Sequence, residues 1–177
     1  MPKDCDTSRT RPLRLRKPDA TDGAAIWELV KTCAPLDENS MYCNLVQADH
    51  FRDTCVLAER GDEVLGWISG HMIPAREELF VWQVAVSPKA RGLGLGRKML
   101  RELIARDACE EATHLKTTIT KDNAASWALF RSFARSIDGE LTDEPHFERD
   151  THFEGQHDTE HMVSITLPEA APLIRAA

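Results

Sequence analysis

Hydrophobic residues recur along this chain with two periods, and each period predicts a kind of secondary structure. A two-residue period, or a short apolar run, predicts strands at residues 13–16, 55–59, 64–72, 79–86, 115–120 and 163–167. A period of three to four residues predicts helices at residues 22–33, 41–51, 95–111 and 122–137. The inner face of the last helix is expected to carry Trp127, Phe130, Ala134 and Ile137. Helix caps are expected at Thr21 or Asp22, at Asn39 or Ser40, and at Asp122 or Asn123. The pattern therefore predicts a domain in which strands and helices are mixed.

The strand at residues 79–86 is apolar at odd and even positions alike, so we expect it to be buried on both faces at the centre of a sheet. The helix that follows carries Leu95, Met99, Leu100 and Leu103 on one side and charged residues on the other. It is expected to cover one face of that sheet.

A glycine loop separates this strand from this helix: Arg91-Gly92-Leu93-Gly94-Leu95-Gly96. Glycines accept positive φ and expose backbone N–H groups, and a helix N-terminus adds unpaired donors and a positive dipole end. The loop is therefore expected to hold a phosphate or pyrophosphate. Gly96 is not followed by Lys-Ser or Lys-Thr, as a P-loop requires, and the G-x-G-x-G spacing differs from that of a dinucleotide fingerprint.

The size and composition of the 177-residue chain predict a single soluble domain. We expect the domain at residues 12–168, a disordered tail at residues 1–11 and a C-terminal tail at residues 169–177. No stretch reaches the roughly 20 apolar residues of a membrane span, and the start has no apolar leader, so a cytoplasmic location is expected. Five scattered cysteines without a C-x-x-C pair favour reduced thiols over disulfides or metal binding.

The net charge of -7 is concentrated between Asp138 and His161, where nine acidic residues stand against Arg149 alone. Such a segment disfavours nucleic acid and suits a cationic substrate, or it is simply a solvated loop. It also contains His157-Asp158-Thr159-Glu160-His161, which fits the zinc-protease pattern H-x-x-E-H. That pattern needs both histidines on one helix face, and Gly155 before it and strand alternation after it disfavour a helix.

The order of these elements, the Arg-x-x-Gly-x-Gly loop and a second motif at Asn123-x-x-Ser126-x-x-Leu129-Phe130 resemble the GCN5-related N-acetyltransferase (GNAT) superfamily over residues 13–167. The resemblance implies an α/β fold: a mostly antiparallel, twisted sheet that is splayed at the cofactor site and has helices on both faces. It implies acetyl-CoA as cosubstrate and no metal. The cofactor-binding residues it implies are Val84, Ala85, Val86, Arg91, Gly92, Leu93, Gly94, Leu95, Gly96, Arg97, Asn123 and Ser126.

One position departs from that superfamily. Many members carry at the position of Phe130 a tyrosine that protonates the leaving thiolate, whereas the only tyrosine of this chain is Tyr42. A thiol has an ordinary pKa near ~8.5, so its thiolate is a tolerable leaving group and Tyr42 or a water is sufficient as the acid.

A narrower resemblance concerns the acceptor. Residues 35–44, residues 80–86 and His157-Asp158-Thr159-Glu160 resemble the diaminobutyrate-acetylating members of the superfamily, which act in ectoine synthesis. This implies acetyl transfer to the γ-amine of L-2,4-diaminobutyrate, and a homodimer. The substrate-binding residues it implies are Asp37, Tyr42, Asn44, Trp82 and Glu160, with Glu160, Asp37 and Tyr42 as the catalytic set.

Each of these residues also has a plainer interpretation. Asp37 can cap a turn, Trp82 can be core, Asn123 can cap a helix and Asn44 can lie on a solvated face. Two alternative functions stay open as well: a GNAT enzyme for another small amine or amino acid, and a non-catalytic acyl-CoA sensor.

Overall fold

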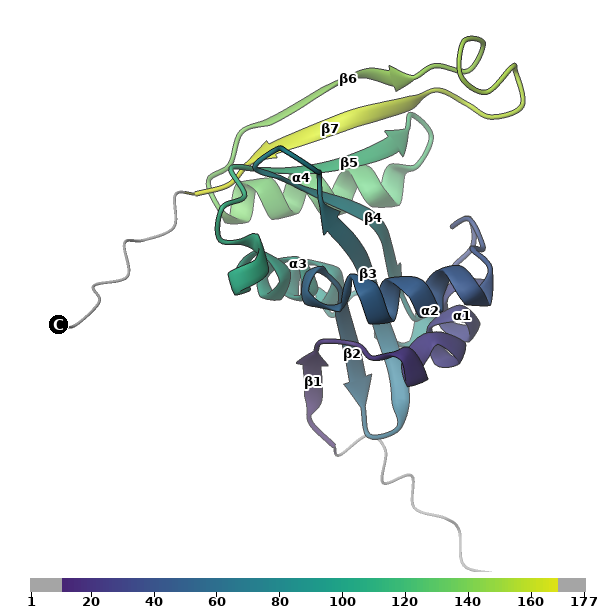
Figure 1. Cartoon of the computed structure of the whole chain (residues 1–177), viewed down its shortest axis with the longest axis vertical. Helices are drawn as coiled ribbons and strands as arrows, with labels where there is room; N and C mark the ends of the chain where they lie inside the picture. The colour runs from purple at the N-terminus through teal and green to yellow at the C-terminus, as the bar shows by residue number, and fades with distance from the viewer. Residues whose placement is uncertain (1–10, 169–177) are drawn as a thin grey trace, which may run out of the picture. The chain divides into compact units, whose positions relative to one another are not determined.

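The computed structural model describes residues 11–168 of the chain. Its hydrogen-bonded strands form one seven-stranded sheet in the order β1-β2-β3-β4-β5-β7-β6 (Figure 1). The strands are β1 (Leu13–Arg16), β2 (Val56–Arg60), β3 (Glu63–Met72), β4 (Glu78–Val86), β5 (His114–Thr120), β6 (Leu141–Phe147) and β7 (Glu160–Thr166). β4 and β5 pair in parallel, while β1–β2, β2–β3, β5–β7 and β6–β7 are antiparallel. The expectation of a mixed, mostly antiparallel sheet is confirmed.

Four helices accompany the strands in the described part of the chain: α1 (Gly23–Lys31), α2 (Met41–His50), α3 (Leu95–Ile104) and α4 (Ala124–Ser136). Five of the expected strands and three of the expected helices lie within two residues of their predicted bounds. The helix expected to run to residue 111 is the exception. It ends at Ile104, since Arg106 has extended backbone, and Asp107–Cys109 form a separate 3-10 turn.

The chain divides into two compact units. The first comprises the described residues up to Gly70 together with Gln83–Leu103, and the second comprises His71–Trp82 together with the described residues from Ile104 on. The first residues of the predicted N-terminal tail, 1–10, and the predicted C-terminal tail, 169–177, lie outside the described residues. The prediction of a single domain at 12–168 stays a prediction.

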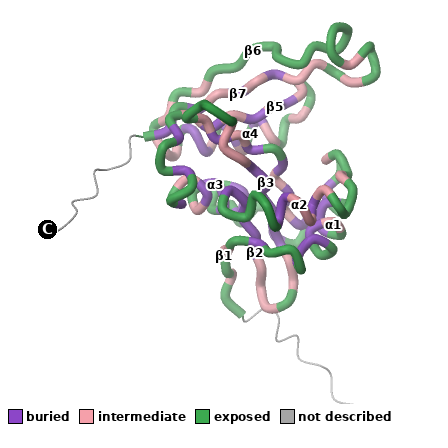
Figure 2. The backbone as a smooth tube through the Cα atoms, viewed as in Figure 1, coloured by how far each residue is buried: buried purple, intermediate pink, exposed green. Residues whose placement is uncertain are grey.

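In the first unit, helices pack on both faces of the sheet. α1 and α2 cover the face that carries Leu57, Trp67 and Ala85, which belong to one buried cluster with residues of both helices (Figure 2). The opposite face meets α3 at Gly66, where an added Cβ would lie 2.8 Å from Met99 Sδ. A side chain at Gly66 would therefore have to displace the end of the Met99 side chain.

Arg16 ties the first strand to the helical layer. Its guanidinium donates to both carboxylate oxygens of Asp22, at 2.7 Å each, and to Glu59 Oε2 at 2.9 Å. The bond to Asp22 and then that to Glu59 raise the pKa of Arg16 above its ordinary value, against the opposing effect of burial. The arrangement fixes β1, β2 and the start of α1 together.

Asp22, one of the two predicted caps of the first helix, is the N-cap residue of α1, but its side chain makes no capping hydrogen bond to that helix. Asp19, and neither Thr21 nor Asp22, caps a short 3-10 turn, Ala20–Asp22, that precedes α1. Asp19 accepts from Thr21 N at 2.8 Å while Asp22 accepts from Asp19 N at 2.8 Å, so the two carboxylates form a reciprocal capping box. The second expected cap is confirmed at Ser40, which accepts from Cys43 N at 3.1 Å.

In the second unit, α4 packs along the three strands β5, β7 and β6 (Figure 1). Trp127, Phe130, Phe133 and Ala134 are its buried residues. Trp127 Nε1 also donates to Thr120 O at 3.0 Å, which fastens the helix to the end of β5. Trp127, Phe130 and Ala134 were predicted for the inner face of this helix, whereas Ile137 follows its last turn and is half-buried.

The sequence pattern did not indicate β6. Its seven residues include Pro145 and two acidic residues, and six of the seven are exposed, so they show no apolar alternation. It is the edge strand of the sheet, where proline and charge are tolerated because one side of the backbone needs no partner. β7 likewise begins at Glu160, three residues before the predicted start, because its pairing with β6 extends to Phe147.

The expectation that the central strand is buried on both faces is also wrong. Leu79, Val81, Gln83 and Ala85 of β4 are buried, whereas the alternate positions are half-buried or exposed, and Trp82 is 51% exposed. Apolar side chains on a partly open face are typical of ligand sites, which are lined mainly by hydrophobic groups.

Candidate active site

The glycine loop has the backbone that an anion site requires. Gly92 and Gly94 have φ of +78° and +67°, a conformation that favours glycine. α3 begins directly after them at Leu95, and Lys98 N is already bonded to Gly94 O at 3.1 Å. An added Cβ at Gly92 would meet nothing within 4 Å, so the backbone is open to solvent at this point. Arg91, Arg97 and Lys98 are exposed around it and supply positive charge. These residues fit a pyrophosphate.

The three residues predicted to bind the pantetheine arm lie at the end of β4. Ala85 is buried in the core cluster, while Val84 and Val86 are half-buried on the other side of the strand. The parallel pairing of β4 with β5 covers only Glu78, Leu79 and Phe80, so β4 continues for six residues after its register with β5 ends. The pairing of the two strands therefore ends before the three residues predicted to bind the cofactor.

Asn123 stands at the N-cap of α4, and its Oδ1 accepts from Ser126 N at 3.1 Å. The two residues of the predicted second cofactor motif are therefore joined to each other. The capping role that we considered as an alternative is confirmed for Asn123. It occupies the amide oxygen and not the amide NH₂ group, so capping and cofactor binding are compatible.

Three of the predicted substrate residues belong to the first unit. Asp37 lies exposed in the loop between α1 and α2, and Tyr42 in the first turn of α2 is 74% exposed. Asn44 is fully buried, so its interpretation as a solvated surface residue is wrong. Neither its Nδ2 nor its Oδ1 has a hydrogen-bond partner among the described residues, which is unusual for a buried amide.

The other two belong to the second unit. Trp82 lines a pocket of about 800 Å³ together with Phe80, Met162 and residues of β3, β5 and β6. Its interpretation as a core residue is wrong, because half of it is exposed. Glu160 begins β7, where its side chain is 19% exposed and its Oε1 lies 4.0 Å from His157 Nε2. Glu160 is not among the residues that line the pocket of Trp82.

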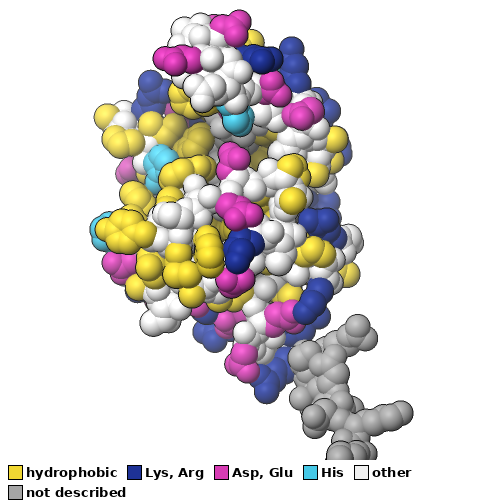
Figure 3. Space-filling view, turned by 90° about the vertical axis from the view of Figure 1, so that its right-hand side faces the viewer, with side chains coloured by type: hydrophobic (Ala, Val, Ile, Leu, Met, Phe, Trp, Pro, Cys, Tyr) yellow, Lys and Arg dark blue, Asp and Glu magenta, His cyan; other side chains and the backbone are white. Residues whose placement is uncertain are grey.

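Several large apolar side chains of the described residues, including two predicted substrate residues, are exposed to solvent. Tyr42, Leu93, Trp82 and Phe147 are among the large hydrophobic residues with more than a third of their surface in solvent. Figure 3 shows one face on which hydrophobic side chains are open to solvent beside histidines and acidic groups.

Burial changes the pKa of three side chains: His71, Cys43 and Cys109. It lowers the pKa of His71, which lines the pocket of Trp82 with its ring centroid 5.4 Å from that of Phe80. His71 is therefore neutral at physiological pH. Burial raises the pKa of the Cys43 thiol on α2, and it raises the pKa of Cys109 to about 11 despite the opposing charge of Arg106. Neither thiol is a nucleophile at neutral pH.

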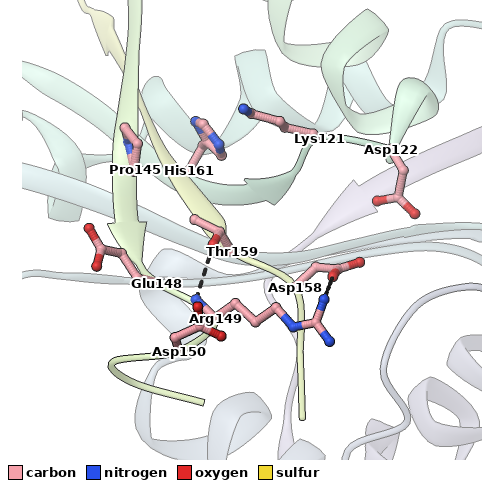
Figure 4. A pocket seen from close by; sticks show the side chains of 9 residues that line it. All are labelled: Lys121, Asp122, Pro145, Glu148, Arg149, Asp150, Asp158, Thr159 and His161. Carbon is pink, nitrogen blue, oxygen red and sulfur yellow. Dashed lines mark hydrogen bonds and ion pairs between the residues drawn. The ribbon is translucent and has the colours of Figure 1, made fainter. Parts of the chain in front are cut away.

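The acidic segment 148–159 is an ordered loop between β6 and β7. Arg149 N donates to Thr159 Oγ1 at 3.0 Å, and the Arg149 guanidinium lies 3.9 Å from Asp158 Oδ1 (Figure 4). These residues line a second pocket, of about 570 Å³, together with Lys121, Asp122, Glu148 and Asp150. Most of the acidic side chains of the segment are exposed, as expected of a solvated loop.

The zinc pattern does not have the geometry that it needs. His157 precedes β7 and His161 lies within it, so the two residues are not one turn apart on a helix. His161 Nδ1 instead lies 3.2 Å from Asp143 Oδ2 on β6, and its side chain is 7% exposed.

Gln83 is a residue that the sequence reasoning missed. It is buried on β4, and its Nε2 donates to Asp37 O at 2.9 Å. The signal was available, because Gln83 is the one polar residue within the apolar run 79–86.

A mixed sheet whose central parallel pair separates early, followed by a glycine loop at a helix N-terminus, defines a class of acyl-CoA-binding domains. Residues 23–134 match the model of the acetyltransferase (GNAT) family. The chain belongs to that family.

Its relatives narrow the assignment. L-2,4-diaminobutyric acid acetyltransferase of Methylotuvimicrobium alcaliphilum is 46% identical over 154 residues, which cover 86% of this chain and 90% of the relative. The enzyme of the same name from Vibrio cholerae is 45% identical over 157 residues, covering 88% and 91%. A solved structure of diaminobutyrate acetyltransferase from Paenibacillus lautus, in complex with its substrate L-2,4-diaminobutyric acid and coenzyme A, has a TM-score of 0.84 and 33% identity over 92% of this chain and 99% of that one. Within the GNAT family, the chain groups with these diaminobutyrate acetyltransferases.

Proposed function

We propose that this chain transfers an acetyl group from acetyl-CoA to the γ-amine of L-2,4-diaminobutyrate, giving N4-acetyl-L-2,4-diaminobutyrate in ectoine biosynthesis. The observation that carries the proposal is the likeness of nearly the whole chain to relatives of this one activity, at 45–46% identity. The open glycine loop at the start of α3 supports acetyl-CoA as the donor.

The cofactor residues fall into three groups. Backbone N–H groups from Arg91, Gly92, Leu93, Gly94, Leu95, Gly96 and Arg97 hold the pyrophosphate. The main chain at Val84, Ala85 and Val86 pairs with the pantetheine arm, which the early end of the β4–β5 register favours. The amide NH₂ of Asn123, together with Ser126, contacts the same arm from α4.

The acceptor must lose a proton before it attacks. With an ordinary amine pKa of about 10.4, only about one molecule in a thousand is neutral near pH 7, a handicap of roughly 4 to 5 kcal/mol. We assign Glu160 to receive or orient that proton, since a mostly buried carboxylate can do so with little solvent competition. The neutral amine then attacks the thioester carbonyl, and the amide C–N bond forms as the C–S bond breaks and the thiolate of coenzyme A leaves. The second proton of the attacking nitrogen passes to water or, by way of Tyr42, to that thiolate, so that a neutral amide and a thiol result.

The remaining substrate residues recognise the rest of the molecule. Asp37 attracts an ammonium group of diaminobutyrate, and Tyr42 and Asn44 supply hydrogen-bonding groups. The unpartnered amide of Asn44 supports this role, because a buried polar group without a partner costs stability. Trp82 forms an apolar wall. Tyr42 also provides a phenolic O–H for the leaving thiolate, in place of the tyrosine that Phe130 replaces.

The experiment that tests the proposal is an acceptor panel with acetyl-CoA. Coenzyme A release is measured with diaminobutyrate, ornithine, lysine and a set of polyamines. We expect diaminobutyrate to have the highest kcat/KM. A higher kcat/KM for another amine would identify that amine as the acceptor and contradict the proposal. Binding of acetyl-CoA without thiol release in the presence of any amine would instead indicate an acyl-CoA sensor.

We also infer that the enzyme is a cytoplasmic homodimer. The dimer rests on the resemblance to the diaminobutyrate-acetylating members of the family. The location rests on free thiols at Cys33, Cys43, Cys55 and Cys109. No helix within residues 11–168 has the length and apolar character that crossing a membrane would demand.

A further inference from the structure

Gln83 is a buried polar residue in an apolar strand, and its side-chain NH₂ group makes a hydrogen bond to a residue outside the sheet. The side chain is 6% exposed, and its Nε2 donates to Asp37 O at 2.9 Å. Gln83 and Asp37 both belong to the first unit and are 46 residues apart in the chain. The bond therefore joins the loop between α1 and α2 to the central strand.

Burying the Gln83 amide costs free energy, and within residues 11–168 only its NH₂ group has a hydrogen bond to offset that cost. Gln83 Oε1 is buried and has no hydrogen-bond partner among the described residues. A methionine of similar length would fill the same space without that cost, and the flanking residues of β4 are apolar. The glutamine is therefore explained by what its NH₂ group holds, which is the backbone of Asp37.

The loop is held on either side of this residue, since Leu36 packs against the buried cluster before it. Leu36 N bonds to Cys33 O at 3.1 Å at its start, and Ser40 caps α2 at its end. Asp37 lies between these two points with its side chain exposed, so the direction of its carboxylate follows from the position of its backbone. The hydrogen bond from Gln83 ties the backbone of Asp37 to β4, and β4 is itself held within the sheet.

We propose that Gln83 is a positioning residue for the acceptor: it holds Asp37 at the place where its carboxylate binds the ammonium group of the diamino acid. The proposal rests on the proposed function of Asp37. In this role Gln83 acts through Asp37. Loss of the Gln83 side chain is therefore expected to weaken the binding of diaminobutyrate and to leave the binding of acetyl-CoA unchanged.

The test compares Gln83→Met with Gln47→Met. Gln47 is a matched control, because it is also a buried amide, 3% exposed, with an unpartnered Oε1, but its Nε2 contacts Cys43 Sγ on its own helix. Gln83→Met is expected to raise the KM for diaminobutyrate about tenfold, the effect of one lost buried hydrogen bond, with the KM for acetyl-CoA within twofold of the parent. Gln47→Met is expected to leave both constants within twofold.

A pH profile adds a readout that a purely structural role would not move. In Gln83→Glu the introduced carboxyl group donates to Asp37 O only while it is protonated, and when ionised it repels that oxygen. The KM for diaminobutyrate of Gln83→Glu, divided by that of Gln83→Met at the same pH, is expected to fall as the pH is lowered. A ratio that does not change with pH contradicts the positioning role.

Hydrogen exchange separates this proposal from the proposed function, because it needs no substrate. The amide of Leu36, which donates to Cys33 O beside Asp37, is expected to exchange at least fivefold faster in Gln83→Met than in the parent or in Gln47→Met. If the parent enzyme does not acetylate diaminobutyrate, the proposed function fails while the exchange rates still decide whether Gln83 holds the loop. Unchanged exchange, or an equal loss of acetyl-CoA affinity, overturns the proposal.

Discussion

At the residue scale, Glu160 is the side chain whose proposed role is most sensitive to a small change. Glu160→Gln keeps the shape of the side chain and removes its ability to accept a proton. We expect kcat for diaminobutyrate to fall at least 100-fold, the ordinary contribution of a general base, with the Kd for acetyl-CoA unchanged. Steady-state kinetics and calorimetry measure the two quantities. Equal losses in both would show that Glu160 acts on the fold and not on the amine.

Gly94 makes the complementary prediction for the donor. A β-branched residue at its φ of +67° is strained by about 1 to 3 kcal/mol and covers backbone that the pyrophosphate approaches. We expect Gly94→Val to raise the Kd for acetyl-CoA at least tenfold. Gly155→Val is the matched control, since Gly155 has φ of +79° and open space around it but lies in the β6–β7 loop. A similar loss of acetyl-CoA affinity in both variants would contradict the assignment.

The residues of the candidate site differ in how far the sequence could predict them. The glycine loop is visible because its function requires glycine at particular positions, and the structure gives Gly92 and Gly94 the positive φ expected. Asn44 shows the opposite case. Its burial depends on which side of α2 faces the sheet, and an asparagine on a short helix carries no signal of that orientation. Gln83 was visible as an interruption of an apolar run, but its partner Asp37 was not.

At the scale of elements, Arg16 joins β1, β2 and the start of α1, so its removal should be costly. Arg16→Met leaves the carboxylates of Asp22 and Glu59 without their shared partner, and both are mostly buried, at 11% and 17% side-chain exposure. We expect the free energy of unfolding to fall by about 3 kcal/mol in a urea titration. Arg14→Met on the same strand is the control. Arg14 is 71% exposed and 3.6 Å from Glu59, so its loss should cost less than about 1 kcal/mol.

Elements could be predicted where their residues bury a periodic face. α4 was predicted from Trp127, Phe130 and Ala134, and all three are buried. β6 was missed because an exposed edge strand has no periodic face and is defined only by its pairing with β7. The open face of β4 was misjudged for a related reason. Its apolar residues indicate contact with something apolar, and the sequence does not say whether that is the core or a ligand.

At the scale of the whole molecule, the order of elements predicted the class of fold, and the glycine loop predicted the acetyl donor. Neither feature predicts the acceptor, because Asp37 and Asn44 lie in one compact unit and Trp82 and Glu160 lie in the other. Residues so far apart in sequence form no motif, and only the resemblance of three separate segments assigned them together. The relatives named for this one activity support diaminobutyrate as the acceptor, and the assignment of these four residues to it stays a prediction.

The proposed homodimer is also a property of the whole molecule. Two chains of 19.9 kDa give a particle of about 40 kDa. We expect sedimentation equilibrium at micromolar protein to yield that mass at physiological ionic strength. A mass near that of one chain over the whole concentration range would contradict the proposal.

The central claim is that this enzyme acetylates the γ-amine of L-2,4-diaminobutyrate, and the identity of the product tests it most directly. After incubation of the enzyme with acetyl-CoA and diaminobutyrate, NMR correlation between the new amide proton and the carbon chain locates the acetyl group. The account predicts a single product with the amide proton coupled to the γ-CH₂ and stoichiometric release of coenzyme A. A product acetylated on the α-amine, or no product above the uncatalysed background, would contradict it.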